Sequence, residues 1–392
     1  MPNLYLNKPQ FNAELEKCLQ CPSKPCMHAC PVLCSPHDFI ADAKNADWQK
    51  AAQHIHNQNP LGEICGLICP EKFCMKVCVR KNIDHAIRIP PVQAYIMKNA
   101  RENNLINYGF DVTPNGKKVA VIGLGPSGIG AVTELLKHGF QVTAFEKENT
   151  VGGAINLIPQ MRLPRELINY QWQKLCSSPL LEAKLNTECH DYSALLQQGF
   201  DAVIVTIGEQ KISKLGILGE ELAVNYTDYL KNPQNYPCTG HVAIVGGGAV
   251  AVDCATTAAK AGAHHVEMFV RRRVGDMRIT MPERMSLFAN NIDITTMTRV
   301  SKIEQQNNKL TAYTLKTQFN AEQKLIDVPN TEIARANIDL IILALGSTKS
   351  EEQIENADIL YAGDFAHGGS TAVEAIASGK KAAVGICQRF GY

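Results

Sequence analysis

Nine of the fourteen cysteines lie between residues 18 and 78, and this clustering constrains the fold more than any other feature of the chain. The first run, CLQCPSKPCMHACP, begins at Cys18, has the spacing C-x2-C-x4-C-x3-C and ends in proline. The second run, CGLICPEKFCMKVC, begins at Cys65 and contains C-x4-C-x3-C. So many thiols in about one fifth of a chain require either disulfides or bound metal.

The bulk composition favours metal over disulfides. The 392 residues are 45% hydrophobic and 20% charged, which is globular composition with room for two or three cores. A net charge of +1 gives no field that would attract nucleic acid or anionic lipid. The N-terminus lacks the apolar segment of a signal peptide, and no apolar stretch is long enough to span a membrane. We therefore expect a cytoplasmic protein without nucleic-acid or membrane partners, whose thiols bind metal in a reducing compartment.

The cysteine spacing predicts two 4Fe–4S clusters. Structural zinc usually takes two C-x2-C pairs, and only Cys18 and Cys21 form one. In two-cluster ferredoxins the last cysteine of such a run, before proline, serves the other cluster. The same logic assigns the first cluster to Cys18, Cys21, Cys26 and Cys78, and starts the second with Cys30, Cys69 and Cys74. Cys34 and Cys65 are nearby candidates for the missing eighth ligand. A single cluster, or zinc, remains the alternative. A polar, Ala-rich helical stretch is expected between the runs, from Asp38 to Asn57.

A first dinucleotide-binding motif follows residue 116. An apolar strand, 118–122, leads into Gly123, Gly125 and Gly128 as G-x-G-x-x-G; a helix and a second strand, 141–145, end at Glu146. A glycine motif indicates a dinucleotide site only in the right context, which is a strand before it, a helix after it and an acid about 20 residues on. All three are present here, with the acid 23 residues after the first glycine. Gly125 lets a pyrophosphate approach the backbone, the helix N-terminus attracts it, and Glu146 can bind a ribose.

The motif returns 123 residues later as Gly246, Gly248 and Ala251. Aligning the strands sets Val270 against Glu146, so the ribose-binding acid is missing. Three arginines, Arg271, Arg272 and Arg273, come next. An arginine fork suits a 2′-phosphate, which favours NADP(H) over NAD(H), although NAD(H) remains possible and a solvated basic loop is the alternative.

Two such units in one chain usually bind a flavin and a nicotinamide, and the first should hold FAD. Gly152 and Gly153 stand where flavoproteins with two dinucleotide domains keep a glycine pair. The C-terminal stretch DILYAGDFAHGGSTAVEAIASGKKAAVGI resembles their A-G-D signature. This resemblance implies that Gly363 and Asp364 contact the flavin, with a helix over 371–386 pointing its N-terminus at the ring.

The cysteine region resembles the N-terminal iron–sulfur domain of dihydropyrimidine dehydrogenases and of the small subunit of NADPH-dependent glutamate synthase. In that family the eighth cluster ligand is a Gln or a Glu after an isoleucine-rich stretch. HAIRIPPVQAYI places Gln93 on that position. Gln rather than Glu favours the small subunit of a bacterial dihydropyrimidine dehydrogenase. Pro90 and Pro91 replace the family's small residues without removing a ligand.

The expected fold class is α/β, with two Rossmann-like dinucleotide-binding domains of the pyridine nucleotide-disulfide oxidoreductase type, for FAD and NAD(P)H. They are preceded by an α-helical two-cluster iron–sulfur domain. We predict an iron–sulfur domain over 1–113, an FAD-binding domain over 114–209 and 347–392, and an NAD(P)H-binding domain over 210–346.

The predicted activity is NAD(P)H-dependent oxidoreduction, with electrons passing through FAD and two 4Fe–4S clusters to a larger partner subunit. No residue is assigned a catalytic acid–base role, because hydride transfer to a flavin requires none. The resemblance implies an FMN-type TIM-barrel partner, for which the chain has no room, and pyrimidine (uracil or thymine) reduction. The alternatives are a glutamate synthase small subunit, a sulfide- or ferredoxin-linked relative, and a non-catalytic redox-sensing flavoprotein scaffold.

Overall fold

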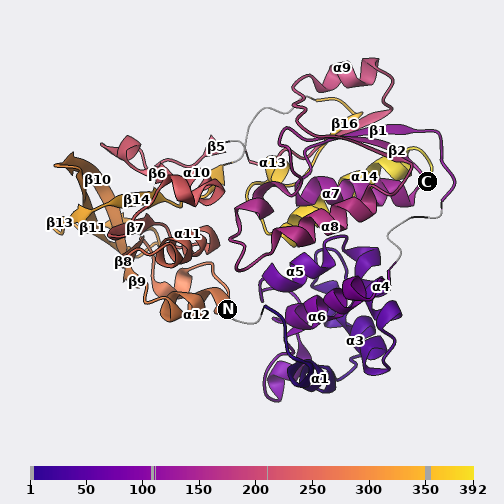
Figure 1. Cartoon of the computed structure of the whole chain (residues 1–392), viewed down its shortest axis with the longest axis horizontal. Helices are drawn as coiled ribbons and strands as arrows, with labels where there is room; N and C mark the ends of the chain where they lie inside the picture. The colour runs from indigo at the N-terminus through magenta and orange to yellow at the C-terminus, as the bar shows by residue number, and fades with distance from the viewer. Residues whose placement is uncertain (1–3, 107–109, 111, 210, 349–354) are drawn as a thin grey trace. The chain divides into compact units, whose positions relative to one another are not determined.

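The computed structural model describes residues 4–106, 110, 112–209, 211–348 and 355–392. The chain divides into two compact units. The first contains Met1–Asn156, Gln160–Lys211 and Thr348–Tyr392, and the second contains Leu157–Pro159 and Ile212–Ser347. Figure 1 colours the chain from its N-terminus to its C-terminus.

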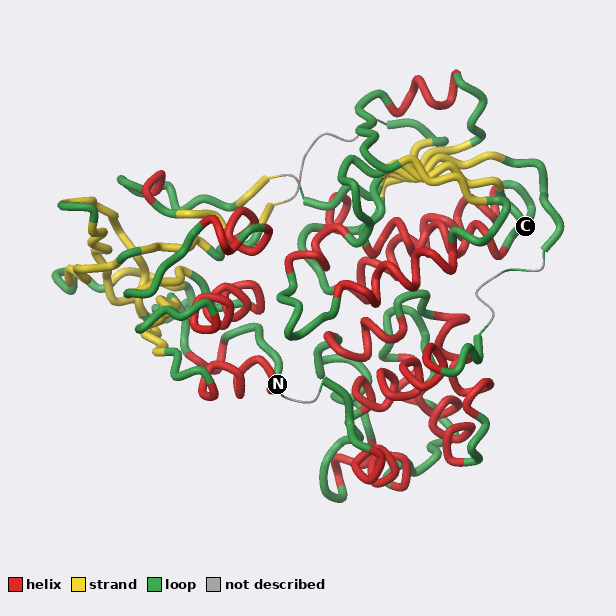
Figure 2. Tube along the Cα trace, in the orientation of Figure 1, coloured by secondary structure: helices red, strands yellow, loops and turns green. Residues whose placement is uncertain are grey.

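The N-terminal part of the first unit is helical, as Figure 2 shows in red. Its elements are α1 (Lys8–Glu16), α2 (Pro25–His28), α3 (Pro36–Lys44), α4 (Trp48–Gln58), α5 (Gly62–Ile68), the 3₁₀ turn η1 (Val79–Asn82) and α6 (Ile89–Glu102). The stretch expected to be helical between the cysteine runs is two helices rather than one. Ala46 adopts a left-handed φ of 59° after α3, and the Asp47 side chain then caps α4 by accepting from the Lys50 N–H.

The rest of the first unit is a five-stranded parallel sheet in the order β16-β4-β1-β2-β3. Its strands are β1 (Lys118–Ile122), β2 (Gln141–Phe145), β3 (Leu181–Lys184), β4 (Ala202–Val205) and β16 (Ile359–Tyr361). The helices are α7 (Pro126–Lys137), α8 (Arg165–Leu175), α9 (Tyr192–Gln197), α13 (Asp364–His367) and α14 (Ala372–Arg389). In Figure 1, α7 and α14 cover one face of this sheet and α9 lies across the other. β1 and β4 are apolar and almost wholly buried, as expected of parallel strands covered on both faces.

The second unit holds another five-stranded parallel sheet, in the order β6-β14-β7-β8-β9. Its strands are β6 (Val224–Asn225), β7 (His241–Val245), β8 (His265–Val270), β9 (Asp293–Thr296) and β14 (Leu340–Leu343). Its helical elements are η3 (Glu220–Leu222), α10 (Tyr226–Lys231), η4 (Pro233–Asn235), α11 (Ala249–Lys260), η5 (Val274–Asp276) and α12 (Met281–Ala289). The chain passes between the units at η2 (Gly153–Leu157), β5 (Lys211–Ile212) and β15 (Ser347–Thr348).

An antiparallel sheet that the sequence analysis did not predict covers one face of the second sheet. It contains β10 (Thr298–Gln306), β11 (Lys309–Phe319), β12 (Leu325–Asp327) and β13 (Ile333–Ile338). Val300, Ile303 and Ile338 are almost wholly buried in one cluster with Phe269 of β8 and Ile341 of β14. This packing explains why β14 is apolar on both faces and why Phe269 of β8 is buried.

No helix in the described part of the chain is long and apolar enough to cross a membrane.

Candidate functional site: two cysteine-lined cavities and two glycine turns

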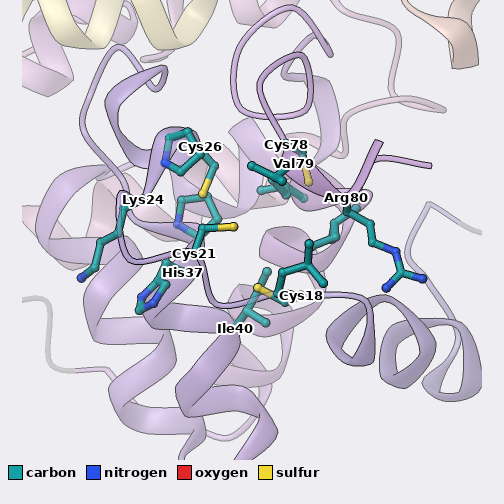
Figure 3. Close-up of a pocket in the computed structure, with 14 residues that line it drawn as sticks. Cys18, Cys21, Lys24, Cys26, His37, Ile40, Cys78, Val79 and Arg80 are labelled. Carbon is teal, nitrogen blue, oxygen red and sulfur yellow. The ribbon is translucent and has the colours of Figure 1, made fainter. Parts of the chain in front are cut away.

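The four thiols predicted to hold the first cluster line one cavity, of about 400 Å³ including space open to solvent. Cys18 and Cys21 lie on the loop after α1, Cys26 lies in α2, and Cys78 immediately precedes η1. Figure 3 shows their sulfur atoms pointing into a common space, with the side chains of Lys24 and Arg80 directed away.

Local backbone conformation explains how closely spaced cysteines of the first run converge. Gln20 and Lys24 both have left-handed φ values, 50° and 43°, so the chain reverses twice between Cys18 and Cys26. The Gln20 side-chain amide donates to the Cys18 sulfur at 3.2 Å. Burial raises the pKa of the Cys26 thiol to about 11, so this thiol is neutral unless a cation replaces its proton.

A second cavity, of about 390 Å³ by the same measure, contains the remaining predicted ligands. Cys30, Cys69, Cys74 and Gln93 all line it, together with Cys34, Cys65 and Val373 of α14. Gly66 of α5 explains the close approach of α5 to α6, since a Cβ there would lie 2.5 Å from the Ala94 backbone nitrogen. Gln93, which precedes Ala94, is therefore held beside α5, which contains Cys65.

Gln93 is oriented within this second cavity. Its side-chain N–H donates to the Gly62 carbonyl at 2.7 Å, which leaves its Oε1 facing the Cys34 sulfur at 3.9 Å. Burial raises the pKa of the Cys30 thiol, while the backbone N–H groups of Val32, Leu33 and Cys34 act against that rise. Donors arranged in this way stabilise a thiolate bound to metal.

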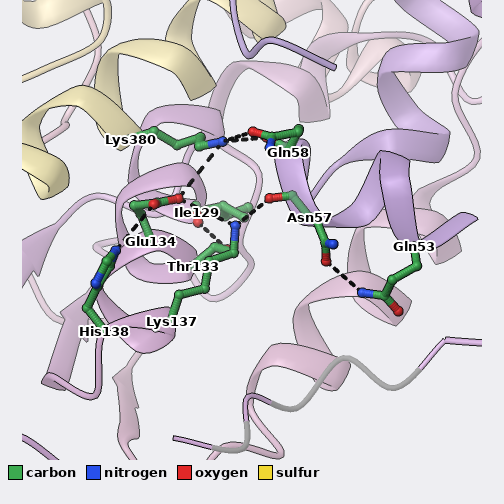
Figure 4. A network of polar contacts seen from close by, with 9 residues as sticks. All are labelled: Gln53, Asn57, Gln58, Ile129, Thr133, Glu134, Lys137, His138 and Lys380. Atoms are coloured by element: carbon green, nitrogen blue, oxygen red, sulfur yellow. Dashed lines mark hydrogen bonds and ion pairs between the residues drawn. The ribbon is translucent and has the colours of Figure 1, made fainter. Parts of the chain in front are cut away.

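The helical domain is fixed to the helices α7 and α14 by charged side chains (Figure 4). Lys380 of α14 donates to the Gln58 carbonyl at 2.7 Å, and Lys137 of α7 donates to the Asn57 carbonyl at 2.5 Å. Both carbonyls belong to the last turn of α4, where cations are favourable. Lys72 also pairs with Glu374 in the first turn of α14, at 3.2 Å. The second cavity thus lies against the N-terminal turn of α14, which contributes Val373.

The first glycine turn has the geometry of a dinucleotide site. Gly123 has a φ of 93°, and a Cβ on Gly128 would lie 1.9 Å from its carbonyl oxygen. Gly125 begins α7 beside Gly153, whose φ is 52° and whose added Cβ would lie 3.1 Å from the Gly125 Cα. Glu146 is 7% exposed, and its carboxylate accepts from the Leu124 N–H at 2.7 Å. It therefore stands beside the turn where a ribose would bind.

The A-G-D segment lies at the N-terminal end of α7. Gly363, with a φ of 70°, approaches Ser127 so closely that a Cβ would lie 2.8 Å from the serine Cβ. Burial raises the pKa of Asp364, and the Ser370 hydroxyl donates to its carboxylate. Ser127, which sequence analysis missed, is buried, and its hydroxyl has no hydrogen-bond partner in the described residues. This hydroxyl and the glycine turns fit the phosphate and ribityl groups of FAD.

The second glycine turn repeats the first, but the strand position after it that corresponds to Glu146 is not acidic. Gly246 has a φ of 148°, and a Cβ there would lie 2.3 Å from the Ala344 carbonyl oxygen. A Cβ on Gly248, which begins α11, would meet no atom within 4 Å, and Ala251 is wholly buried beneath the turn. The open space at Gly248 fits a pyrophosphate at the helix N-terminus.

The strand register sets Val270 at the place of Glu146. Gly123 N–H donates to the carbonyl of Phe145, the residue before Glu146, and Gly246 N–H donates to that of Phe269, the residue before Val270. Arg271, Arg272 and Arg273 follow and are exposed. Arg273 is engaged with Asp276 at 3.0 Å and stacks over Phe319. Among the contacts of the described residues, neither Arg271 nor Arg272 has an ion pair.

Three site features were not predicted from the sequence. Ser127 was signalled only by its place inside the G-x-G-x-x-G motif. Gly247 leaves room for Val270, since a Cβ on it would lie 2.7 Å from a Val270 methyl group. The register of the sheet sets this contact, so the sequence does not signal it. Lys380 gave no sequence signal, because its partner, Gln58, lies 322 positions away. No group of three or more His, Cys, Asp or Glu placed to hold a single metal ion occurs in the described residues.

Comparisons with known proteins define the class. Residues 3–105 match the model described as dihydropyrimidine dehydrogenase domain II, 4Fe-4S cluster, and residues 117–379 match pyridine nucleotide-disulphide oxidoreductase. With the two glycine turns, these matches define an NAD(P)H-dependent flavin/iron–sulfur oxidoreductase whose cofactors are 4Fe–4S clusters, FAD and NAD(P)H. The chain belongs to the pyridine nucleotide-disulphide oxidoreductase family, with an added N-terminal iron–sulfur domain.

Curated relatives match along nearly the whole chain. The NAD-dependent dihydropyrimidine dehydrogenase subunit PreT of Escherichia coli strain K12 is 28% identical, over 95% of this chain and 92% of that protein. The glutamate synthase [NADPH] small chain of the same strain is 26% identical, over 96% and 91%. FprA of Mycobacterium tuberculosis, solved in complex with NADPH, shares the fold with a TM-score of 0.55 at 14% identity, covering 70% of this chain and 86% of that one. These results confirm the predicted family resemblance, fold class, oxidoreductase activity and cofactors.

Proposed function

We propose that this chain is the electron-input subunit of an enzyme that reduces pyrimidines such as uracil or thymine. When bound, FAD accepts a hydride from NAD(P)H and the clusters carry single electrons. The feature that carries the choice of pyrimidine is Gln93, whose Oε1 faces the second cysteine-lined cavity. The relatives named as a dihydropyrimidine dehydrogenase subunit support this choice.

The site assignments belong to the same proposal. Cys18, Cys21, Cys26 and Cys78 hold the first cluster, because they line one cavity. The second cluster is held by Cys30, Cys69, Cys74 and Gln93, which line the other.

The nucleotide assignments complete it. The turns around Gly125 and Gly248 hold the two pyrophosphates, Glu146 binds a ribose, and Asp364 lies at the flavin. We also keep the domain boundaries 1–113, 114–209 with 347–392, and 210–346 as part of this proposal.

The partner is a larger subunit that carries the pyrimidine site, and the resemblance suggests an FMN-containing TIM barrel. The chain's own residues explain how electrons reach it. The second cavity lies beside the N-terminal turn of α14, whereas the lining of the first cavity comes only from residues 18–89. The first cluster is therefore the one farther along the route from the flavin domain and is the exit toward the partner.

The test uses the anaerobically purified chain with and without the large subunit encoded beside it. Alone, it should reduce an artificial dye with NAD(P)H but should not reduce uracil, thymine, or glutamine plus 2-oxoglutarate. Adding the large subunit should restore uracil or thymine reduction. Restored glutamate formation would instead assign the chain to glutamate synthase, and pyrimidine reduction by the chain alone would contradict the subunit proposal.

A further inference from the structure

The second cysteine-lined cavity contains more iron ligands than one 4Fe–4S cluster can use. A cube has four iron atoms and takes one protein ligand at each. Five thiols line this cavity, those of Cys30, Cys34, Cys65, Cys69 and Cys74, together with the side-chain amides of Gln93 and Asn59. The proposed assignment uses four of them, which leaves two buried thiols, Cys34 and Cys65, without a role.

The two unused thiols differ in what they face. Cys34 is 2% exposed, and its sulfur lies 3.9 Å from Oε1 of Gln93, the atom proposed to bind iron. Cys65 is equally buried, and it lines the cavity together with Asn59. Asn59 is itself fixed, because its Oδ1 accepts from the Leu61 N–H at 3.0 Å. Among the contacts of the described residues, the thiol that meets Oε1 of Gln93 is that of Cys34.

The loop that carries Cys34 begins at another ligand. The Leu33 N–H donates to the Cys30 carbonyl at 2.9 Å, and Leu33 has a left-handed φ of 57°. This turn returns the chain to the cavity, so the sulfurs of Cys30 and Cys34 both face it. A thiol at this place needs only side-chain rotation or a small loop shift to approach an iron that the amide has released.

We propose that Cys34 is a reserve ligand, which binds the iron otherwise bound by Gln93 when that amide is absent or dissociates. The inference rests on the proposed assignment of a second cluster to this cavity. In the exchange the iron–oxygen bond to Gln93 breaks, an iron–sulfur bond to Cys34 forms, and the thiol proton passes to water. No electron is transferred in this step.

The exchange has a spectroscopic consequence. A neutral amide is replaced by an anionic thiolate, so the cluster becomes more negative by one charge. A more negative cluster is harder to reduce, and its midpoint potential falls. A neutral amide is also a weaker ligand than a thiolate, so its iron is the one most easily lost, and a neighbouring thiol would recapture that iron.

The experiment compares iron content, the EPR spectrum of the reduced protein and the midpoint potential of each cluster. The variants are Gln93→Ala, Cys34→Ala and the double variant Gln93→Ala/Cys34→Ala, all prepared anaerobically. We expect Gln93→Ala to keep about eight irons per chain, with a changed second-cluster signal and a lower potential. Cys34→Ala should resemble the wild type. The double variant should lose at least one iron and the four-iron signal of the second cluster.

The matched control is Gln93→Ala/Cys65→Ala, which should behave as Gln93→Ala alone because the sulfur in contact with Oε1 of Gln93 is that of Cys34. The first-cluster EPR signal reports whether each variant folds. If the double alanine variant loses that signal too, Gln93→Ala/Cys34→Val replaces it, with the same expected loss of the second four-iron signal.

Two results would overturn the reserve-ligand proposal. One is loss of the second cluster in Gln93→Ala alone, which would show that no thiol replaces the amide. The other is loss in Cys34→Ala alone, which would make Cys34 the native ligand. A wild-type content well below eight irons, with no second-cluster signal, would instead contradict the two-cluster assignment itself.

Discussion

At the scale of single residues, the second glycine turn differs from the first because a valine stands where the first has a glutamate. Val270 occupies the strand position where Glu146 stands in the first site, and no carboxylate follows it directly. Arg273 is engaged with Asp276 and Phe319, so Arg271 and Arg272 are the two arginines of this run that we propose for a 2′-phosphate. The relatives' names include both NAD-dependent and NADPH-dependent proteins, so nucleotide preference is a property to measure.

We predict that the wild type uses NADPH with a higher kcat/KM than NADH, and that Arg271→Ala/Arg272→Ala removes the difference. Losing a charge-assisted phosphate contact costs about 1.5–3 kcal/mol, which corresponds to roughly a ten- to hundredfold loss of kcat/KM with NADPH. The value for NADH should change little. Steady-state dye reduction with each nucleotide measures both.

Arg273→Ala is the matched control for this prediction. It removes one positive charge from the same loop. The side chain that it removes already has partners in Asp276 and Phe319. It should leave the nucleotide preference nearly unchanged. Equal use of both nucleotides by the wild type would show that the arginines form only a solvated loop.

At the scale of elements, the flavin domain depends on how closely α7 and α14 pack. A Cβ on Gly379 of α14 would lie 1.9 Å from the Ser127 carbonyl oxygen, and one on Gly130 of α7 would lie 2.6 Å from the Ile376 carbonyl oxygen. Because Ser127 belongs to the first turn of α7, this packing sets the position of the helix N-terminus that faces the dinucleotide.

We predict that Gly379→Ala weakens flavin binding and destabilises the domain. Forcing an extra methyl group into packed backbone typically costs about 1–3 kcal/mol, which outweighs the roughly 0.5–1 kcal/mol that alanine contributes in a helix. Flavin should be released at a lower temperature than in the wild type. The release is followed by flavin fluorescence during heating.

Gly385→Ala in the same helix is the control. A Cβ there meets only the Leu360 side chain, at 3.8 Å, so the alanine keeps its helix advantage without a clash. Flavin release should occur at the wild-type temperature or slightly above it. An equal drop in both variants would mean that glycine matters for helix flexibility rather than for packing against α7.

These elements also show what sequence could and could not predict. The strands at 118–122 and 141–145 match β1 and β2, because glycine motifs and apolar runs are local signals. The helix expected over 371–386 is α14, which begins after the capping residue Thr371. The antiparallel sheet of β10 to β13 was missed, because its polar, lysine- and glutamine-rich strands are buried on one face only. The break between α3 and α4 was missed because it depends on a left-handed alanine, which composition does not signal.

At the candidate site, the grouping of cysteines could be predicted and the contacts around them could not. The spacing of the runs divided seven thiols into two groups. In the structure the members of each group line the same cavity. The contacts of Lys380 with the Gln58 backbone carbonyl and of Cys34 with the Gln93 side chain join distant segments, and no local pattern encodes those pairings. The ligand roles themselves, and the predicted domain boundaries, stay predictions that cluster analysis and limited proteolysis can test.

At the scale of the whole molecule, the positions of the two cavities predict an order for the proposed electron flow. The second cavity is lined by Val373 of α14, and Lys380 of the same helix holds α4, so this cavity is fixed to the flavin-binding domain. The first cavity is lined by residues of the helical domain alone, including Leu19 and Val79, which are 43% and 39% exposed. Electrons leaving the flavin domain should therefore reach the second cluster before the first.

This order predicts different effects of losing each cluster. Cys30→Ser replaces a proposed ligand of the second cluster, and Cys26→Ser replaces a proposed ligand of the first. With NADPH under anaerobic conditions, Cys26→Ser should still show a reduced second-cluster EPR signal, because that cluster receives electrons directly from the flavin. Cys30→Ser should leave the first cluster oxidised over the time in which the wild type reduces it, because the intermediate carrier is missing.

Dye reduction and partner-dependent turnover separate this explanation from general damage. Both variants should keep flavin-to-dye activity close to that of the wild type, and both should lose pyrimidine reduction with the large subunit, since either break interrupts the route. Dithionite should still reduce the first cluster in Cys30→Ser, which shows that this cluster is present and intact. Rapid NADPH-driven reduction of the first cluster in Cys30→Ser would contradict the order, because electrons would then reach the exit without passing the cavity beside α14.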